Sequence, residues 1–170
     1  MRIATAIAAA AFMFSTAAFA APVSIAPVTF SPELEETIAE EYGAREGEYL
    51  RDAVTEALSR ALARRGATVT DGAPVTVEVT IVDADPNRPT FEQLGHRPGL
   101  DPLRSISIGG AELRAVLRDS SGETISEVTH RRYNHDLREV TGAESTWTEA
   151  RHAIRQFATK VADAYAASGR

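Results

Sequence analysis

Two long segments with apolar residues on one side only constrain the fold of this 170-residue chain most strongly. Residues 46–65 and 146–167 carry apolar side chains at the three- and four-residue spacing of an α-helix, with polar residues between them. Each predicted helix therefore has one face to bury and one face to leave in water. We expect both helices on the same face of one β-sheet, because neither has a second apolar face to offer to another layer.

Short local patterns predict where the helices begin and end. Ser31 followed by a proline predicts the start of a shorter helix, which Gly43 ends. Gly66 is expected to end the helix over 46–65. Thr146 and Glu149 have the spacing of a capping box, which predicts Thr146 as the N-cap of the last helix.

Four segments have the residue pattern of β-strands. Residues 75–82 alternate strictly between apolar and polar, which predicts a strand with one buried and one solvated face. Residues 106–118 and 123–134 flank a four-residue turn and are expected to form a hairpin. Residues 21–30 are predicted to form the first strand, with Pro27 causing a bend or marking an edge.

Two irregularities are expected within the hairpin. Gly109 and Gly110 predict a bulge or a close approach of another backbone. Ile125 and Val128 are both apolar but differ in parity, so a bulge or a register shift is expected in this strand.

The resulting order of elements is β-α-α-β-β-β-α, which predicts an α+β fold. Residues 21–170 are expected to form a single domain, a two-layer sandwich with a mostly antiparallel sheet of about four strands. The two long helices are expected to cover one face of that sheet.

Residues 83–105 form the longest segment without a regular pattern, and they contain four of the eight prolines. Thr90 and Gln93 match a capping box, which predicts a helical turn inside the segment. Loops of this length in compact domains are usually functional or disordered. We expect an ordered loop that acts as a lid over the sheet or as a recognition site. The candidate partner-binding residues are Arg88, Phe91, Leu94, His96, Arg97 and Arg104.

Residues 1–20 have the layout of a secretory signal peptide, with one positive charge, an apolar run and an Ala-Phe-Ala ending. The sequence therefore predicts export to a bacterial periplasm, with no stable membrane anchor after cleavage. The chain contains no cysteine, so a lipidated cysteine, thiol catalysis and thiolate metal sites are excluded.

Charge and motif patterns argue against several further functions. Residues 21–170 hold 17 basic and 24 acidic side chains, and this net negative charge disfavours nucleic acid as a partner. Asp83 and Asp85 resemble the opening of a calcium loop, but Arg88 and Leu94 occupy the positions that need glycine and glutamate. A looser oxygen site at the two aspartates stays open as an alternative. No metal, no cofactor and no catalytic residue is predicted, and the protein is expected not to be an enzyme.

Two short segments carry a resemblance to known proteins: ALARRG at residues 61–66 and RDSSGETI at residues 118–125. With the order of elements, they resemble the amino-terminal domain of the Tol system's periplasmic propeller protein. They are also similar to periplasmic lipoproteins that assist envelope transport and secretion. The resemblance implies a two-layer sandwich that binds partners and does not catalyse a reaction.

The leading hypothesis is a non-enzymatic periplasmic protein that binds another envelope protein through the 83–105 loop and the adjacent sheet edge. The alternative is a small-ligand-binding protein or minor hydrolase. Its cleft would lie between loop and sheet and would hold Asp83, Asp85, Arg88 and His96. A purely structural or inhibitory module is the third hypothesis.

Overall fold

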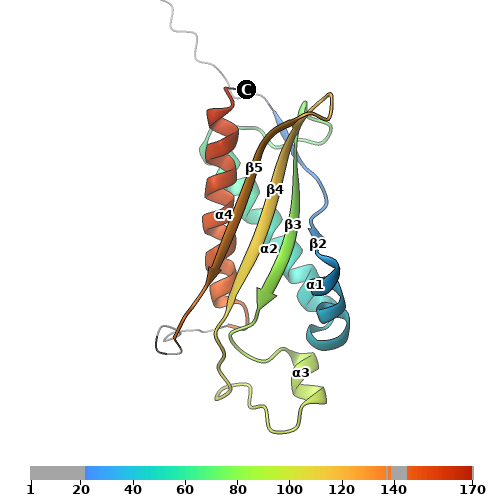
Figure 1. The fold of residues 1–170 in the computed structure, drawn as a ribbon, viewed down its shortest axis with the longest axis vertical. Helices are drawn as coiled ribbons and strands as arrows, with labels where there is room; N and C mark the ends of the chain where they lie inside the picture. Colours follow the sequence, from blue (N-terminus) through green and yellow to red (C-terminus); the bar gives the residue numbers. More distant parts are fainter. Residues whose placement is uncertain (1–21, 137, 139–144, 170) are drawn as a thin grey trace, which may run out of the picture.

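The computed structural model describes residues 22–136, 138 and 145–169, so the predicted signal peptide lies outside the described residues. It confirms an α+β sandwich in which helices cover one face of a five-stranded sheet (Figure 1). The strands are β1 (Val23–Ile25), β2 (Thr29–Phe30), β3 (Val75–Asp85), β4 (Gly110–Asp119) and β5 (Thr124–Tyr133). The helices are α1 (Pro32–Thr37), the π-helical turn η1 (Ile38–Tyr42), α2 (Ala44–Arg64), α3 (Phe91–His96) and α4 (Thr148–Ala167). None of these described helices is long and apolar enough to cross a membrane.

Strand β3 lies at the centre of the sheet. Strands β3, β4 and β5 form an antiparallel meander, with Ala115 opposite both Val79 and Val128. Strands β1 and β2 both pair with the other edge of β3, in parallel. The predicted single strand over 21–30 is therefore wrong in its extent. Pro27 lies in the break between the two short strands, where its missing N–H costs no sheet hydrogen bond.

The core lies between the sheet and helices α2 and α4. The alternating side chains of β3 and β4 point toward the helices, and the apolar stripes of both helices are buried against them. The largest fully buried side chains include Leu50, Leu58 and Leu62 of α2, Ile81 and Leu113 of the sheet, and Phe157 and Tyr165 of α4. The opposite face of the sheet carries exposed ion pairs such as Arg114–Glu127 and Arg118–Glu78. The sheet thus has the one buried and one solvated face that its alternation predicts.

The boundaries of the long loop differ from the prediction. Strand β3 continues to Asp85 after a bulge between Ile81 and Asp83, and β4 begins only at Gly110. The loop therefore runs over residues 86–109. The register shift expected in the hairpin is confirmed, since the pairing changes between Leu117 and Arg118, opposite Ile125.

The prediction of Thr146 as the N-cap of the last helix is wrong. Helix α4 begins after Trp147, and no side chain within two residues of its start caps it. The side-chain oxygen of Asn87, which lies 62 residues earlier, accepts a hydrogen bond of 2.8 Å from the backbone N–H of Glu149 instead. A residue of the loop therefore supplies the cap that the local sequence does not.

Candidate functional site

The loop over residues 86–109 lies beyond the ends of the strands and does not cover the sheet (Figure 1). Its short helix α3 packs against the π-helical turn η1, which precedes α2. The expected lid over the sheet is therefore wrong, because the sheet face toward the helices is already filled and the other face is solvated. The loop instead extends one end of the molecule.

Hydrogen bonds within the loop hold its shape. The predicted capping box at Thr90 and Gln93 is confirmed, with bonds of 3.2 and 3.1 Å. The carboxylate of Asp101 accepts hydrogen bonds from the backbone N–H groups of Leu103 and Arg104, both at 2.8 Å. The guanidinium of Arg88 donates to the carbonyl of Leu103 at 2.6 Å, which joins the two limbs of the loop.

Asn87 anchors the loop to the rest of the fold. The residue is fully buried and is hydrogen-bonded through both its backbone and its side chain. Its backbone N–H donates to Thr146, and its carbonyl accepts from the backbone of Ser107 at 2.9 Å. Its side-chain nitrogen donates to the carbonyl of Ser107 at 3.3 Å, while its oxygen caps α4. One side chain thus links both limbs of the loop and the start of α4.

The loop, the end of β3 and η1 line an open cavity of about 670 Å³. It is lined by Glu41, Tyr42, Asp85, Pro86, Arg88, Pro89, Gln93, Arg97, Leu100, Arg104, Ser105, Ile106, Ser107 and Ile108. Three predicted site residues, Arg88, Arg97 and Arg104, therefore meet around one cavity. A salt bridge of 2.6 Å between Arg97 and Glu41 closes one side of it.

The other predicted site residues do not line this cavity. Phe91 is 76% exposed on α3, with the guanidinium of Arg45 5.9 Å from its ring. Leu94 is partly buried. His96 is exposed and lies 3.5 Å from Glu92, one helical turn earlier. Three of the six candidates thus share a cavity and three lie on the surrounding surface.

Two tyrosines contact the aspartates at the end of β3. Asp83 accepts a hydrogen bond of 2.5 Å from the hydroxyl of Tyr133, and Tyr42 lies beside Asp85 along the wall of the cavity. Burial raises the pKa of the Asp85 carboxyl above its ordinary 3.8, and the neighbouring Asp83 raises it further, while the Tyr42 hydroxyl acts in the opposite direction. Burial and the charges of Asp85 and Asp83 also raise the pKa of Tyr42 far above 10.0, so its hydroxyl stays protonated.

These contacts bear on the metal sites that the sequence left open. Within residues 22–136, 138 and 145–169, no group of three or more His, Cys, Asp or Glu side chains is placed to hold a metal ion. The alternative cleft with Asp83, Asp85, Arg88 and His96 is assembled only in part. Asp85 and Arg88 line the cavity, whereas Asp83 contacts Tyr133 and His96 contacts Glu92.

Exposed apolar side chains gather on this loop. In the part of the chain that the structure describes, the large apolar side chains with high exposure are Tyr49, Val69, Phe91, Leu103, Ile106 and Ile108. Four of these six belong to residues 86–109. Sequence reasoning missed Ile106 and Ile108 because it placed them in a strand. It missed Glu41 and Tyr42 because only the tertiary fold brings η1 against the loop.

A family model for a protein of unknown function (DUF3313) matches residues 8–161 of the chain. The chain belongs to the DUF3313 family. A search of curated proteins finds no relative of this DUF3313 chain.

Three solved structures with low sequence identity to this chain illustrate the likeness of the fold. XCC0632 from Xanthomonas campestris, which matches the DUF330 family model, has a TM-score of 0.51 at 13% identity over 88% of this chain and 86% of its own. The PelC dodecamer of Paraburkholderia phytofirmans has a TM-score of 0.47 at 10% identity, covering 85% and 86%. A minor lipoprotein from Acinetobacter baumannii has a TM-score of 0.40 at 14% identity, covering 87% and 94%.

The likeness to XCC0632 supports the fold alone. Lipoproteins from Acinetobacter baumannii and Neisseria meningitidis are among these neighbours, both at a TM-score of 0.40. The resemblance to the amino-terminal domain of the Tol propeller protein stays a prediction.

Proposed function

We propose that this protein is an exported, non-enzymatic component of the bacterial envelope that binds another envelope protein through its 86–109 loop. The observation that carries the proposal is the apolar surface of that loop, to which Phe91, Leu103, Ile106 and Ile108 contribute. Exposed apolar side chains that gather on one small element, surrounded by charge, are typical of a protein-binding surface. The signal-like residues 1–20 support export to the periplasm.

The order within the loop supports binding without a large conformational change. Asn87, the capping box at Thr90 and the Asp101 turn fix the backbone that presents the apolar side chains. A preorganised surface loses little conformational entropy when a partner binds. Phe91 and Leu103, at 76% and 78% exposure, are the side chains with most apolar area left to bury. Arg97 and Arg104 supply positive charge beside them, so a partner with acidic groups around an apolar patch fits this surface.

Site-specific photo-crosslinking in the native host tests this proposal. A photoreactive residue at position 103 is expected to give one discrete adduct with another envelope protein, and the same residue at Val69 is the control. Val69 is also exposed but belongs to the opposite end of the sheet, next to Val23. Equal adducts at both positions, or none at position 103, would contradict the proposal.

Affinity for the identified partner then measures the contribution of the apolar surface. Burying one large apolar side chain contributes about 1.5–3 kcal/mol, so Leu103→Ser is expected to weaken binding roughly 10- to 100-fold. Val69→Ser is expected to leave the affinity unchanged. Because Leu103 is exposed in the free protein, its replacement should change the melting temperature by no more than about 2 °C.

The cavity beside the loop favours a small acidic or polar ligand as a second candidate function. Its volume of about 670 Å³ suits a small molecule, Arg88 and Arg104 line it, and burial raises the pKa of the Asp85 carboxyl at its edge. A thermal-shift screen of small carboxylates, sugars and esters separates the two functions. Stabilisation that Arg88→Gln abolishes and Leu103→Ser leaves intact would favour the small ligand over the protein partner.

A further inference from the structure

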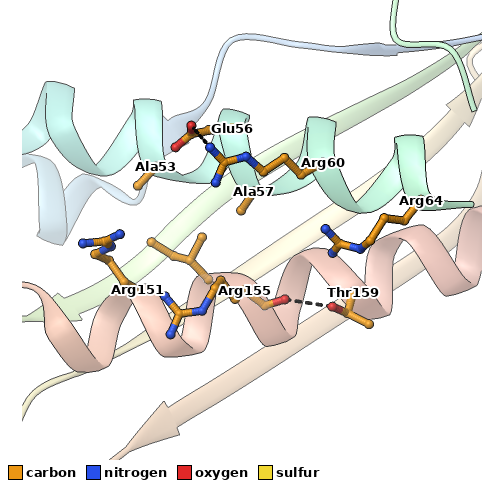
Figure 2. Close-up of a pocket in the computed structure, with 9 residues that line it drawn as sticks. Ala53, Glu56, Ala57, Arg60, Arg64, Arg151, Arg155 and Thr159 are labelled. Carbon is orange, nitrogen blue, oxygen red and sulfur yellow. Dashed lines mark hydrogen bonds and ion pairs between the residues drawn. The ribbon is translucent and has the colours of Figure 1, made fainter.

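A second cavity lies on the outer side of the helical layer, between α2 and α4 (Figure 2). Its volume is about 360 Å³. Ala53 and Ala57 of α2 and the buried Ile154 of α4 supply its apolar surface. The remaining lining residues are polar or charged and come from both helices: Glu56, Arg60, Arg64, Arg151, Arg155 and Thr159. This cavity is called the arginine groove below.

The charge of the arginine groove is opposite to that of the protein. Four arginines line it against one acid, Glu56, which pairs with Arg60 one helical turn later. In the described part of the chain, the guanidinium groups of Arg64, Arg151 and Arg155 have no carboxylate or hydrogen-bond partner. Elsewhere in the described residues, six arginines each form an ion pair with a carboxylate: Arg65, Arg97, Arg114, Arg118, Arg131 and Arg132.

The placement of these arginines costs stability in the free protein. Arg60 and Arg64 are four residues apart on α2, and Arg151 and Arg155 have the same spacing on α4. Like charges at this spacing repel each other on a helix. Arg151 also lies close to the positive N-terminal end of α4, where the helix dipole disfavours a cation. Figure 2 shows Arg60 and Arg64 on α2 and Arg151 and Arg155 on α4, along the two sides of the gap between the helices. A bound anion would reduce the repulsion among the arginines that it contacts.

We propose that the arginine groove binds a phosphate group, carried by an ester whose apolar part lies on Ala53 and Ala57. A guanidinium presents its N–H groups as a planar fork that matches phosphate oxygens. A phosphate has enough acceptor oxygens to bind guanidinium groups from both helices at once. A single carboxylate has two oxygens and binds about one guanidinium group in this way. The phosphate can come from a lipid headgroup or from a soluble phosphate ester. Because the protein as a whole is negatively charged, only the groove itself is expected to attract the phosphate.

The test uses purified protein beginning at residue 21 and two probes at constant ionic strength. Inorganic phosphate is followed by thermal shift, with chloride as the reference anion. Vesicles of phosphatidylcholine, with and without phosphatidylglycerol, are followed by flotation. Arg151→Gln/Arg155→Gln removes two positive charges from the groove. Arg114→Gln/Arg118→Gln removes two from the solvated face of the sheet, so it matches the charge change without touching the groove.

We expect the wild-type protein and the sheet-face variant to bind at least one probe, and the groove variant to bind it at least tenfold more weakly. If only the acidic vesicles bind, the ligand is a lipid headgroup. If inorganic phosphate binds too, the phosphate group alone is sufficient for binding. Equal loss in both variants, or binding of neither probe, overturns the proposal. Binding of polyglutamate in place of both phosphate probes overturns it too, because it identifies an acidic peptide as the ligand.

Arg151→Lys/Arg155→Lys separates charge from geometry. This variant keeps the positive charge but loses the planar forks, so an intermediate loss of binding is expected. Both arginines are exposed, so each variant is expected to fold, and circular dichroism checks this. The loop at residues 86–109 has no residue in the arginine groove, so this proposal and the proposed partner binding can fail independently.

Discussion

Replacing Asn87 with alanine removes the only side chain that links the loop to the start of α4 in the described part of the chain. The change deletes the cap on the Glu149 N–H and the bond to the Ser107 carbonyl, at 2.8 and 3.3 Å. An N-cap contributes about 1 kcal/mol, and a buried backbone group left without a partner costs about 1–3 kcal/mol. We therefore expect Asn87→Ala to lower the free energy of unfolding by roughly 2–3 kcal/mol.

For a domain of this size, 1 kcal/mol corresponds to about 2–4 °C in the melting temperature, so a decrease of roughly 5–10 °C is expected. Thr146→Ala is the matched control, because Thr146 has the position of an N-cap in the sequence but makes no capping bond. Its replacement should change the melting temperature by no more than about 2 °C. Differential scanning calorimetry of the two variants measures both effects.

Hydrogen exchange of backbone amides gives an independent readout of the same prediction. The Glu149 amide should exchange faster in Asn87→Ala, because it donates to the side chain that is removed. The Ser107 amide donates to the Asn87 backbone carbonyl, which alanine keeps, so its exchange and that of amides in the centre of β4 should change only with global stability. If Thr146→Ala destabilised the protein as much as Asn87→Ala, the local capping box would be the true cap. The inferred role of Asn87 would then be refuted.

Two further predictions concern the surroundings of Asn87 and the end of β3. Gly109→Ala would place a Cβ atom in collision with the Asn87 side chain, so it should lower the melting temperature by several degrees. Gly95→Ala is the control: Gly95 belongs to helix α3 and its Cβ would meet open space, so this change should be neutral or slightly stabilising. The pKa of the Asp85 carboxyl is higher in the native protein than its ordinary value of 3.8 in the unfolded chain. The protonated carboxyl therefore contributes stability at low pH, and this contribution is lost as the pH rises from 3.8 through the raised native pKa. Asp85→Asn should therefore melt at a higher temperature than wild type near pH 7, and a difference that stays constant down to about pH 4 would contradict that cause.

The sequence alone was sufficient for the elements whose signals are local. The apolar stripes of α2 and α4, the alternation of β3 and the capping box at Thr90 depend on residues a few positions apart. Their periods decide the type of element and its buried face, and one-sided burial in turn decides the two-layer sandwich. The loop was located because a long irregular segment with four prolines stands out from such periods.

The sequence could not decide which residues meet across the fold. The local pattern predicted Thr146 as the cap of α4, but the loop places the Asn87 side chain within hydrogen-bond distance of the Glu149 N–H. The charged residues of α2 and α4 read as two solvated helix faces. Only the packing of the helices brings Arg60 and Arg64 of α2 to the same groove as Arg151 and Arg155 of α4. Likewise Arg88, Arg97 and Arg104 share a cavity because η1 closes it with Glu41 and Tyr42.

The physical reason is the range of the interactions. Periodicity and caps act between residues within one or two turns, so they are written in the order of the chain. Cavities, trans caps and clusters of like charge arise where segments far apart in sequence pack side by side, and their positions depend on the whole core. The sequence therefore determined the scaffold of this protein, and the tertiary structure decided its two candidate binding surfaces.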